Sequence, residues 1–325
     1  MKAIFKAILL LSTGFLLFNP KYIVAATSPE EIYDLTLMEK NNIKVGSGAD
    51  YESIDSLIES IIEEYNVNTD NIGLAYYNFS NDQHYYINPD LQMIAASTVK
   101  VPIVALYIDL IVQGNLTYES SIPFVEYKFA EETGETSSNM LESSYPLSDL
   151  MFKAITYSDN AAWYSLMAYY NNFGSHRQAL LDFINYYDVP DLFYSDNYNS
   201  AYMAEQWLIK IALDPTYQSL IDNMKSTEPH QLFTSYVKSG MANKYGRVDE
   251  YVHDTGIYYE NDIPQYVLAV YTKDINFADG FLEVLNLRIN EWYRANFLAQ
   301  NLSPLDVNEN ESAIKITDKV EESEE

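Results

Sequence analysis

The sequence has no cysteine among its 325 residues, and it is poor in basic residues. The absence of cysteine excludes disulfides, a thiol nucleophile and lipid attachment through a cysteine. The 19 lysines and arginines are outnumbered by 47 acidic residues, which gives a net charge of −28. Such a chain repels nucleic acid and anionic lipid, so neither is expected as a partner. An anionic substrate would need a local cationic pocket.

Histidine is also scarce, and the four histidines are scattered along the chain (His84, His176, His230 and His253). No His-x-x-x-His pair or Glu-rich cluster supplies the ligand spacing of a metal site. We therefore expect neither a metal ion nor another cofactor.

Long apolar runs are missing as well. The N-terminal segment AILLLSTGFLLF is short for a membrane span. It follows two lysines and precedes the small residues Val24-Ala25-Ala26, a pattern typical of a secretory signal peptide. We predict a signal peptide at residues 1–26 and a secreted or cell-surface protein, with retention of this segment as an N-terminal anchor as the alternative.

The rest of the chain divides into three parts by its patterning. Residues 27–50 are predicted to be a linker. The segment 302–325, which ends EESEE, has few large apolar residues and is predicted to be an acidic, disordered tail. Residues 51–301 have the apolar periodicity of a folded domain, which we expect to be monomeric.

Within the domain, strand patterns occur near both ends and helical patterns between them. The predicted elements, in chain order, are a helix at about 51–65, strands at 71–79 and 84–88, a helical region at about 90–235, strands at 240–248, 252–260 and 265–273, and a helix at about 277–298. We predict an α+β fold in which the terminal helices flank an antiparallel five-stranded sheet and an all-helical lobe is inserted.

The stretch STVK, which begins at Ser97, runs into the apolar helical pattern VPIVALYIDLIVQG. Ser97 is therefore expected at a helix N-terminus, whose field favours an alkoxide, with Lys100 one turn later on the same face. A lysine withdrawn from water has a lowered pKa and can accept the proton of a serine. Alternatively, Ser97 only caps the helix. A second Ser-x-x-Lys, SYVK at 235–238, has no long apolar helix behind it and is predicted to lead into a strand.

The tetrapeptide YSDN occurs twice, at 157–160 and at 194–197. The first copy lies between two helical runs, about 60 residues after Ser97. The second copy lies beside a Pro-Asp turn and before another helix. Capping of a helix would account for either copy. For the second, the predicted capping residues are Asn197, Asn199 and Ser200.

These motifs resemble those of the penicillin-recognising serine hydrolases, and among them most closely the class A β-lactamases. STVK, the first YSDN and a late Lys-x-Gly occur in the family's order, and the resemblance extends over about 51–298. It implies that Ser97 is the nucleophile and Lys100 the general base. Ser158 would be a proton shuttle toward the leaving group, and Asn160 a contact for the substrate amide.

The third motif has two candidates within VKSGMANKYG. Lys238-Ser239-Gly240 fits the family's alphabet better, but Lys244-Tyr245-Gly246 has the family's phase and distance to the following strands, and we prefer it. By the family pattern Lys244 would anchor a substrate carboxylate, and the backbone N–H groups of Ser97 and Arg247 would form the oxyanion hole. Tyr245 replaces the usual threonine or serine, so the hydroxyl that commonly holds that carboxylate is displaced or absent.

One feature of the class A pattern is missing. In these enzymes a loop glutamate, in a Glu-x-x-Leu-Asn pattern, activates the water that releases the product. The corresponding segment 171–200 has no glutamate and no such pattern. Its acidic residues are Asp182, Asp188, Asp191 and Asp196.

We therefore predict an exported serine hydrolase that β-lactams or D-Ala-type cell-wall peptides acylate on Ser97, and that deacylates slowly. Two alternatives stay open at this stage. One is a true β-lactamase that uses a loop aspartate, and the other is a non-catalytic surface protein that uses the scaffold for binding.

Overall fold

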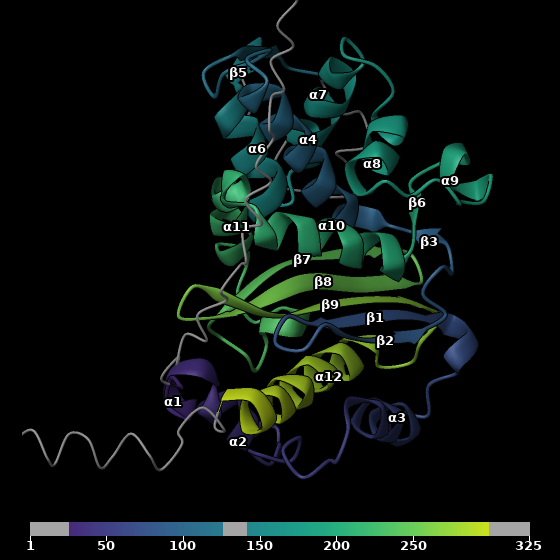
Figure 1. Cartoon of the computed structure of the whole chain (residues 1–325), viewed down its shortest axis with the longest axis vertical. Helices are drawn as coiled ribbons and strands as arrows, with labels where there is room; N and C mark the ends of the chain where they lie inside the picture. Colours follow the sequence, from purple (N-terminus) through teal and green to yellow (C-terminus); the bar gives the residue numbers. More distant parts are fainter. Residues whose placement is uncertain (1–25, 126–141, 299–325) are drawn as a thin grey trace, which may run out of the picture.

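The computed structural model describes residues 26–125 and 142–298 (Figure 1). Among these residues, five strands form an antiparallel sheet in the spatial order β2, β1, β9, β8, β7. Their bounds are β1 (Ile72–Asn78), β2 (Gln83–Ile87), β7 (Met241–Val248), β8 (Tyr251–Glu260) and β9 (Ile263–Lys273). Because β1 pairs with β9, both ends of the domain build one sheet.

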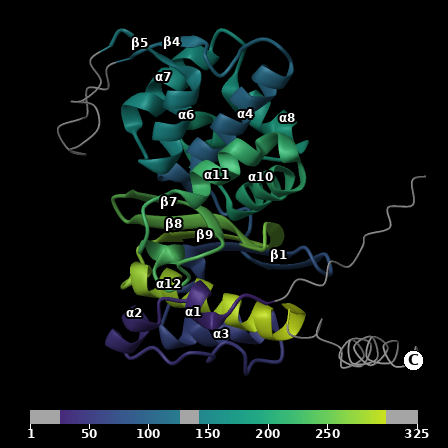
Figure 2. The ribbon, with the colours of Figure 1, turned by 90° about the vertical axis from the view of Figure 1, so that its left-hand side faces the viewer.

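Helices cover both faces of this sheet, as Figure 2 shows from the side. On one face lie α3 (Ile54–Glu64) and α12 (Ala278–Tyr293), which continues into a π-helical turn (Arg294–Leu298). The helical lobe covers the other face, with α10 (Ala201–Leu213) directly against β9 and β1. This arrangement confirms the predicted α+β fold with its five-stranded sheet. The lobe is not all-helical as predicted, because two short strands (Ser121–Pro123 and Ser144–Pro146) pair within it.

The lobe and its connections contain the remaining elements. The helices are α4 (Lys100–Val112), α6 (Leu147–Thr156), α7 (Asn160–Tyr170), α8 (His176–Ile184), α9 (Leu192–Ser195) and α11 (Gln218–Lys225). Short strands pair as β3 (Met93–Ile94) with β6 (Tyr198–Asn199) and β4 (Ser121–Pro123) with β5 (Ser144–Pro146). The 3-10 turns are η1 (Thr69–Asn71), η2 (Ala96–Val99), η4 (Pro215–Tyr217) and η5 (Leu232–Thr234).

The sequence pattern explains where the core lies. Strand β1 is buried on both faces: Leu74 and Tyr76 belong to the core under the sheet, whereas Ala75 and Tyr77 face the lobe. Helix α4 is apolar around most of its circumference and is accordingly buried at the centre of the lobe. A lysine at its first position, Lys100, is thereby carried into the protein interior.

The predicted linker at 27–50 is wrong. This segment forms two short helices, α1 (Pro29–Ile32) and α2 (Leu35–Lys40), and Met38 is fully buried in the core under the sheet. Tyr33 forms a β-bridge with Val237 and donates a hydrogen bond to Asn290 at 2.8 Å. Its apolar residues are too few and too irregularly spaced for a periodicity, so local caps by Ser28 and Asp34 and the tertiary contacts above give the segment its structure.

The predicted signal peptide (residues 1–26, except Ala26) and the predicted acidic tail (302–325) lie outside the described residues. Within the described ranges, no helix has both the length and the hydropathy that crossing a bilayer requires.

Candidate active site

Ser97 lies in the turn η2, which leads directly into α4 between the lobe and the sheet. The preceding residue, Ala96, has φ +48°, a left-handed conformation that is uncommon for a residue with a Cβ. Thr98 fixes the other side of Ser97, because its hydroxyl donates to the Ala95 carbonyl at 2.7 Å and lies 2.8 Å from the Tyr271 hydroxyl. The nucleophile candidate is therefore held in a constrained backbone turn.

Lys100 is buried, with 2% of its surface exposed. Its Nζ donates to the Ser158 carbonyl at 2.6 Å and to Asn160 Oδ1 at 2.8 Å, and it lies 3.3 Å from Ser158 Oγ. Burial lowers the pKa of Lys100 well below its ordinary value, the positive charge of Lys244 lowers it further, and Asp159 opposes both. A neutral Lys100 has a lone pair with which it can accept a proton.

Ser158 connects Lys100 to Ser97. Its Oγ donates to Ser97 Oγ at 2.9 Å and accepts from Lys100. Its φ of +55° reverses the chain between α6 and α7, and Asp159 then caps α7 by accepting from the Ala162 N–H at 3.0 Å. Among the described residues, the hydrogen-bonded route from Ser97 to Lys100 runs through Ser158.

The structure also separates the two Lys-x-Gly candidates. Lys244 is buried in β7, and its charge acts on Lys100, whereas Lys238 is exposed. Burial lowers the pKa of Lys244 to about 8, against the opposing charges of Asp254 and Glu228. The SYVK serine lies elsewhere, since Ser235 Oγ donates to Glu283 on α12 at 2.9 Å.

Gly246 brings β7 against the backbone of Ser97. A Cβ at this position would lie 2.8 Å from the Ser97 nitrogen and 3.1 Å from the Ala95 carbonyl oxygen. Because these contacts are with the backbone, only glycine allows β7 to approach the turn that contains Ser97 so closely. The neighbouring Arg247, predicted to supply the second N–H, points its guanidinium to Asp279 at 2.6 and 3.0 Å.

Tyr245 turns its hydroxyl toward Glu228, to which it donates at 3.2 Å. The Tyr245 carbonyl accepts from Lys244 Nζ at 3.1 Å. Glu228 adds a negative charge near Lys244 that the sequence analysis missed, because its position is set by the fold and not by any motif spacing.

Comparison with known proteins identifies the family to which the chain belongs. Residues 53–288 match the family model described as the beta-lactamase enzyme family. The chain belongs to this family.

Several solved structures have the same fold as this chain, although their sequences are less than 20% identical to it. "Structure of PBP-A" is 19% identical with a TM-score of 0.58, covering 74% of this chain and 95% of that chain. A beta-lactamase from Chitinophaga pinensis (16%, TM-score 0.59) covers 75% and 99%, and one from Burkholderia phymatum (16%, TM-score 0.61) covers 74% and 99%. No curated protein matches significantly. The predicted resemblance is confirmed, and the chain is a serine hydrolase of the β-lactamase type.

The second YSDN of this β-lactamase family member is not merely a helix cap. Ser200 alone caps α10, by accepting from the Met203 N–H at 3.3 Å. Asn197 instead supports the nucleophile turn: its Nδ2 donates to the Ala96 carbonyl at 3.1 Å, and its carbonyl accepts from the Ala95 N–H at 2.7 Å. The capping prediction for Asn197 is therefore wrong. It rested on the general preference of asparagine for helix N-caps, whereas the fold places this side chain against the Ala96 carbonyl.

The capping prediction for Asn199 is wrong as well, and this side chain holds the same turn together with His253, which the sequence analysis did not connect with the site. Asn199 donates to the Tyr271 hydroxyl at 2.8 Å, which in turn contacts Thr98. His253 donates from Nε2 to the Ile94 carbonyl at 2.8 Å, while its Nδ1 accepts from the Thr272 N–H at 3.0 Å. Burial lowers the pKa of His253 to about 4, so the ring is neutral and acts as a structural link.

The loop aspartates of this family member are all exposed (Asp182, Asp188, Asp191 and Asp196). Asp196 Oδ1 accepts from the Asn197 N–H at 2.7 Å. Within the described residues, none of the four is hydrogen-bonded to Ser97, Lys100 or Ser158.

Proposed function

We propose that Ser97 attacks the carbonyl carbon of a β-lactam or a D-Ala-type cell-wall peptide and forms an acyl-enzyme. The observation that carries this proposal is the chain of hydrogen bonds from Ser97 through Ser158 to Lys100. Lys100 itself has a pKa well below its ordinary value. Because a hydroxyl both donates and accepts, reversing these bonds carries the Ser97 proton to Lys100 as the Oγ–carbon bond forms.

Collapse of the tetrahedral intermediate breaks the carbon–nitrogen bond, and Ser158 returns the proton to the leaving nitrogen. The developing oxyanion would accept from the backbone N–H groups of Ser97 and Arg247. Asn160 would contact the substrate amide, and Lys244 its carboxylate.

We also propose that deacylation is slow. It requires a base that activates water, and such help is typically worth about 10²–10⁴-fold. The segment 171–200 offers only exposed aspartates for that role. One similar structure, a variant of PBP-A, is described as an acyl-enzyme complex with penicillin G.

Intact-mass spectrometry after incubation with penicillin tests both parts. We expect a stable mass increase in the wild type and in Ser235→Ala, and none in Ser97→Ala. Labelling that persists without Ser97 would contradict the nucleophile. Rapid multiple turnover that is abolished by Asp196→Asn would instead identify a true β-lactamase.

We further propose that the protein is exported and that its signal peptide is removed. Cleavage after Ala26 would leave Thr27 as the first residue. The Thr27 nitrogen lies 2.7 Å from Glu260 Oε1, and the Glu260 side chain is fully buried beside Arg294 at 2.8 Å. A new α-ammonium group at Thr27 would form an ion pair with this carboxylate.

A further inference from the structure

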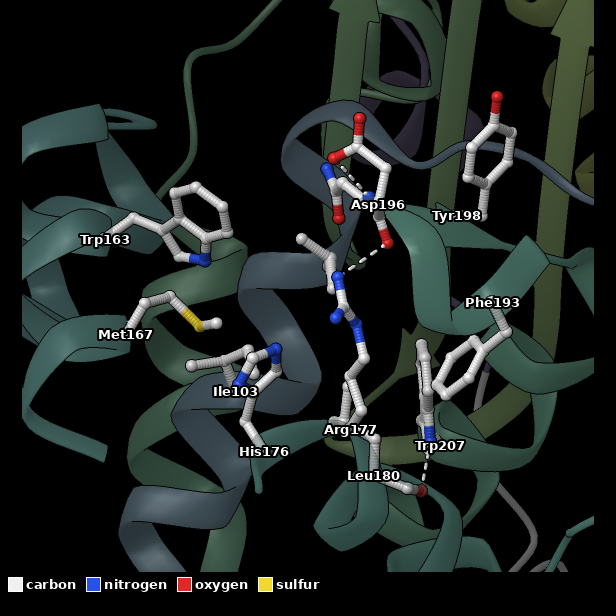
Figure 3. A pocket seen from close by; sticks show the side chains of 12 residues that line it. Ile103, Trp163, Met167, His176, Arg177, Leu180, Phe193, Asp196, Tyr198 and Trp207 are labelled. Atoms are coloured by element: carbon white, nitrogen blue, oxygen red, sulfur yellow. Dashed lines mark hydrogen bonds between the residues drawn. The ribbon is translucent and has the colours of Figure 1, made fainter. Parts of the chain in front are cut away.

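A pocket of about 160 Å³ lies in the helical lobe, next to the turn that contains Ser97 (Figure 3). Helices α4, α7, α8, α9 and α10, the turn η2 and the segment 196–198 surround it. Its lining residues are Val99, Ile103, Trp163, Met167, His176, Arg177, Leu180, Phe193, Asp196, Asn197, Tyr198 and Trp207. The residues that carry the proposed acylation (Ser97, Lys100, Ser158 and Lys244) are not among them.

Two side chains that line this pocket, Trp163 and Arg177, have N–H groups without a hydrogen-bond partner among the described residues. The Trp163 indole N–H is buried and has no hydrogen-bond partner among the described residues. The Arg177 guanidinium donates to the Asp196 carbonyl at 3.1 Å through one of its nitrogens, which leaves most of its five N–H groups for a ligand. Figure 3 shows the indole nitrogen and the guanidinium bordering the same space. A buried N–H without an acceptor costs free energy, which a bound acceptor would recover.

The other donor is His176. Burial, with a smaller contribution from the neighbouring Arg177 charge, lowers the pKa of His176, so its ring is neutral near pH 7 and has one N–H to donate. Asp196 is the one acidic residue in the lining; its side chain is exposed and accepts from the Asn197 N–H at 2.7 Å.

The rest of the wall is apolar. Leu180, Phe193 and Trp207 are at most 3% exposed, and Ile103 is fully buried. The Trp207 N–H is satisfied by the Leu180 carbonyl at 3.3 Å, so this side offers only apolar surface. An occupant must therefore combine an apolar body with a group that accepts several hydrogen bonds.

We propose that this pocket is a second ligand site, for small carboxylates with an aromatic or branched apolar body. Arg177 and Trp163 donate to the carboxylate, and the body packs against Leu180, Phe193 and Trp207. The positive Arg177 supplies the local attraction that a chain of net charge −28 needs for an anion. The pocket does not include Ser97 itself, but it adjoins the turn that contains Ser97 through Val99 and Asn197.

Tryptophan fluorescence with phenylacetate as the probe tests this proposal. Two of the three tryptophans, Trp163 and Trp207, line the pocket. The third, Trp292, lies on α12 and packs against Phe297 in the following π-helical turn. We expect a saturable change in emission in the wild type, in Ser97→Ala and in Trp292→Phe. Phenylacetamide, which has the same shape without the charge, should bind about tenfold or more weakly.

Arg177→Gln should weaken phenylacetate binding about tenfold or more, and Arg177→Lys should restore part of it. Arg288→Gln, on α12, is the matched control and should leave binding unchanged. Equal affinities for the acid and the amide in the wild type, or no saturable change at all, would overturn the proposal even if an Arg177 variant failed to fold.

Discussion

The hydroxyl oxygens of Ser158 and Ser97 lie 2.9 Å apart, although 61 residues separate them in the chain. Ser158 also lies within 3.3 Å of Lys100 Nζ, so it stands between the nucleophile and the base candidate. Removing its hydroxyl should interrupt proton transfer and lower the acylation rate by about 10²–10⁴-fold.

Ser158→Gly is the suitable variant, because glycine accepts the φ of +55° without strain. Stopped-flow acylation with a chromogenic cephalosporin measures the effect, with Ser235→Ala as the control. An acylation rate within threefold of the wild type would remove Ser158 from the route.

Gly246→Ala places a methyl group 2.8 Å from the Ser97 nitrogen. It should obstruct the proposed oxyanion donor and slow acylation by about 10²-fold or more. Gly73→Ala, on β1, is the matched control, since its Cβ would meet nothing closer than 3.4 Å. If both variants acylate equally fast, the N–H of Ser97 is not a donor in the reaction.

The pH dependence of acylation should report Lys244, whose pKa is lowered to about 8. A lysine loses its positive charge as the pH rises through its pKa, so affinity for a carboxylate-bearing substrate should fall by up to about tenfold per pH unit above pH 8. Second-order acylation rates should show this alkaline limb for a penicillin but not for its methyl ester. Lys244→Gln should abolish the limb, and Lys238→Gln should keep it.

Asn160→Ala should lower the acylation rate sharply, because it removes both the predicted substrate contact and an acceptor for Lys100. Asn197→Ala should act through the Ala96 carbonyl, with a loss of roughly 1 kcal/mol of stability and a smaller rate effect. Urea unfolding and acylation kinetics on both variants measure the difference. A larger kinetic loss in Asn197→Ala would reverse the assignment of the two YSDN copies.

N-terminal mass analysis of the exported protein should find Thr27 as its first residue. Glu260→Gln should then cost roughly 3 kcal/mol of stability, because it leaves the Arg294 charge and the new α-ammonium without their buried partner. Lys225→Gln, which removes an exposed ion pair with Asp262 and a cation–π contact with Tyr259, is the control and should cost about 1 kcal/mol, less than Glu260→Gln. A first residue other than Thr27 would contradict the cleavage site.

The sheet could be predicted from the sequence, because β1, β8 and β9 are short segments rich in apolar and aromatic residues, and such segments can be recognised without knowledge of the fold. The sequence was also sufficient to place Lys100 in a buried helix. The residues that surround the site could not be predicted from the sequence. Asn197 and Glu228 come near Ser97 and Lys244 only through tertiary folding. The prediction of a linker at 27–50 was wrong for the same reason, since this segment contacts Val237 and Asn290, which are distant in sequence.

The pairing of β1 with β9 bears on how the chain acquires its structure. Ile72 lies opposite Thr272, so the central ladder of the sheet closes only after nearly the whole domain has been synthesised. Such distant contacts make folding slow, so a newly made chain stays without its completed sheet until β9 has been synthesised. Any chain that ends before β9 leaves the β1–β2 hairpin with an open edge, and such fragments should aggregate rather than fold.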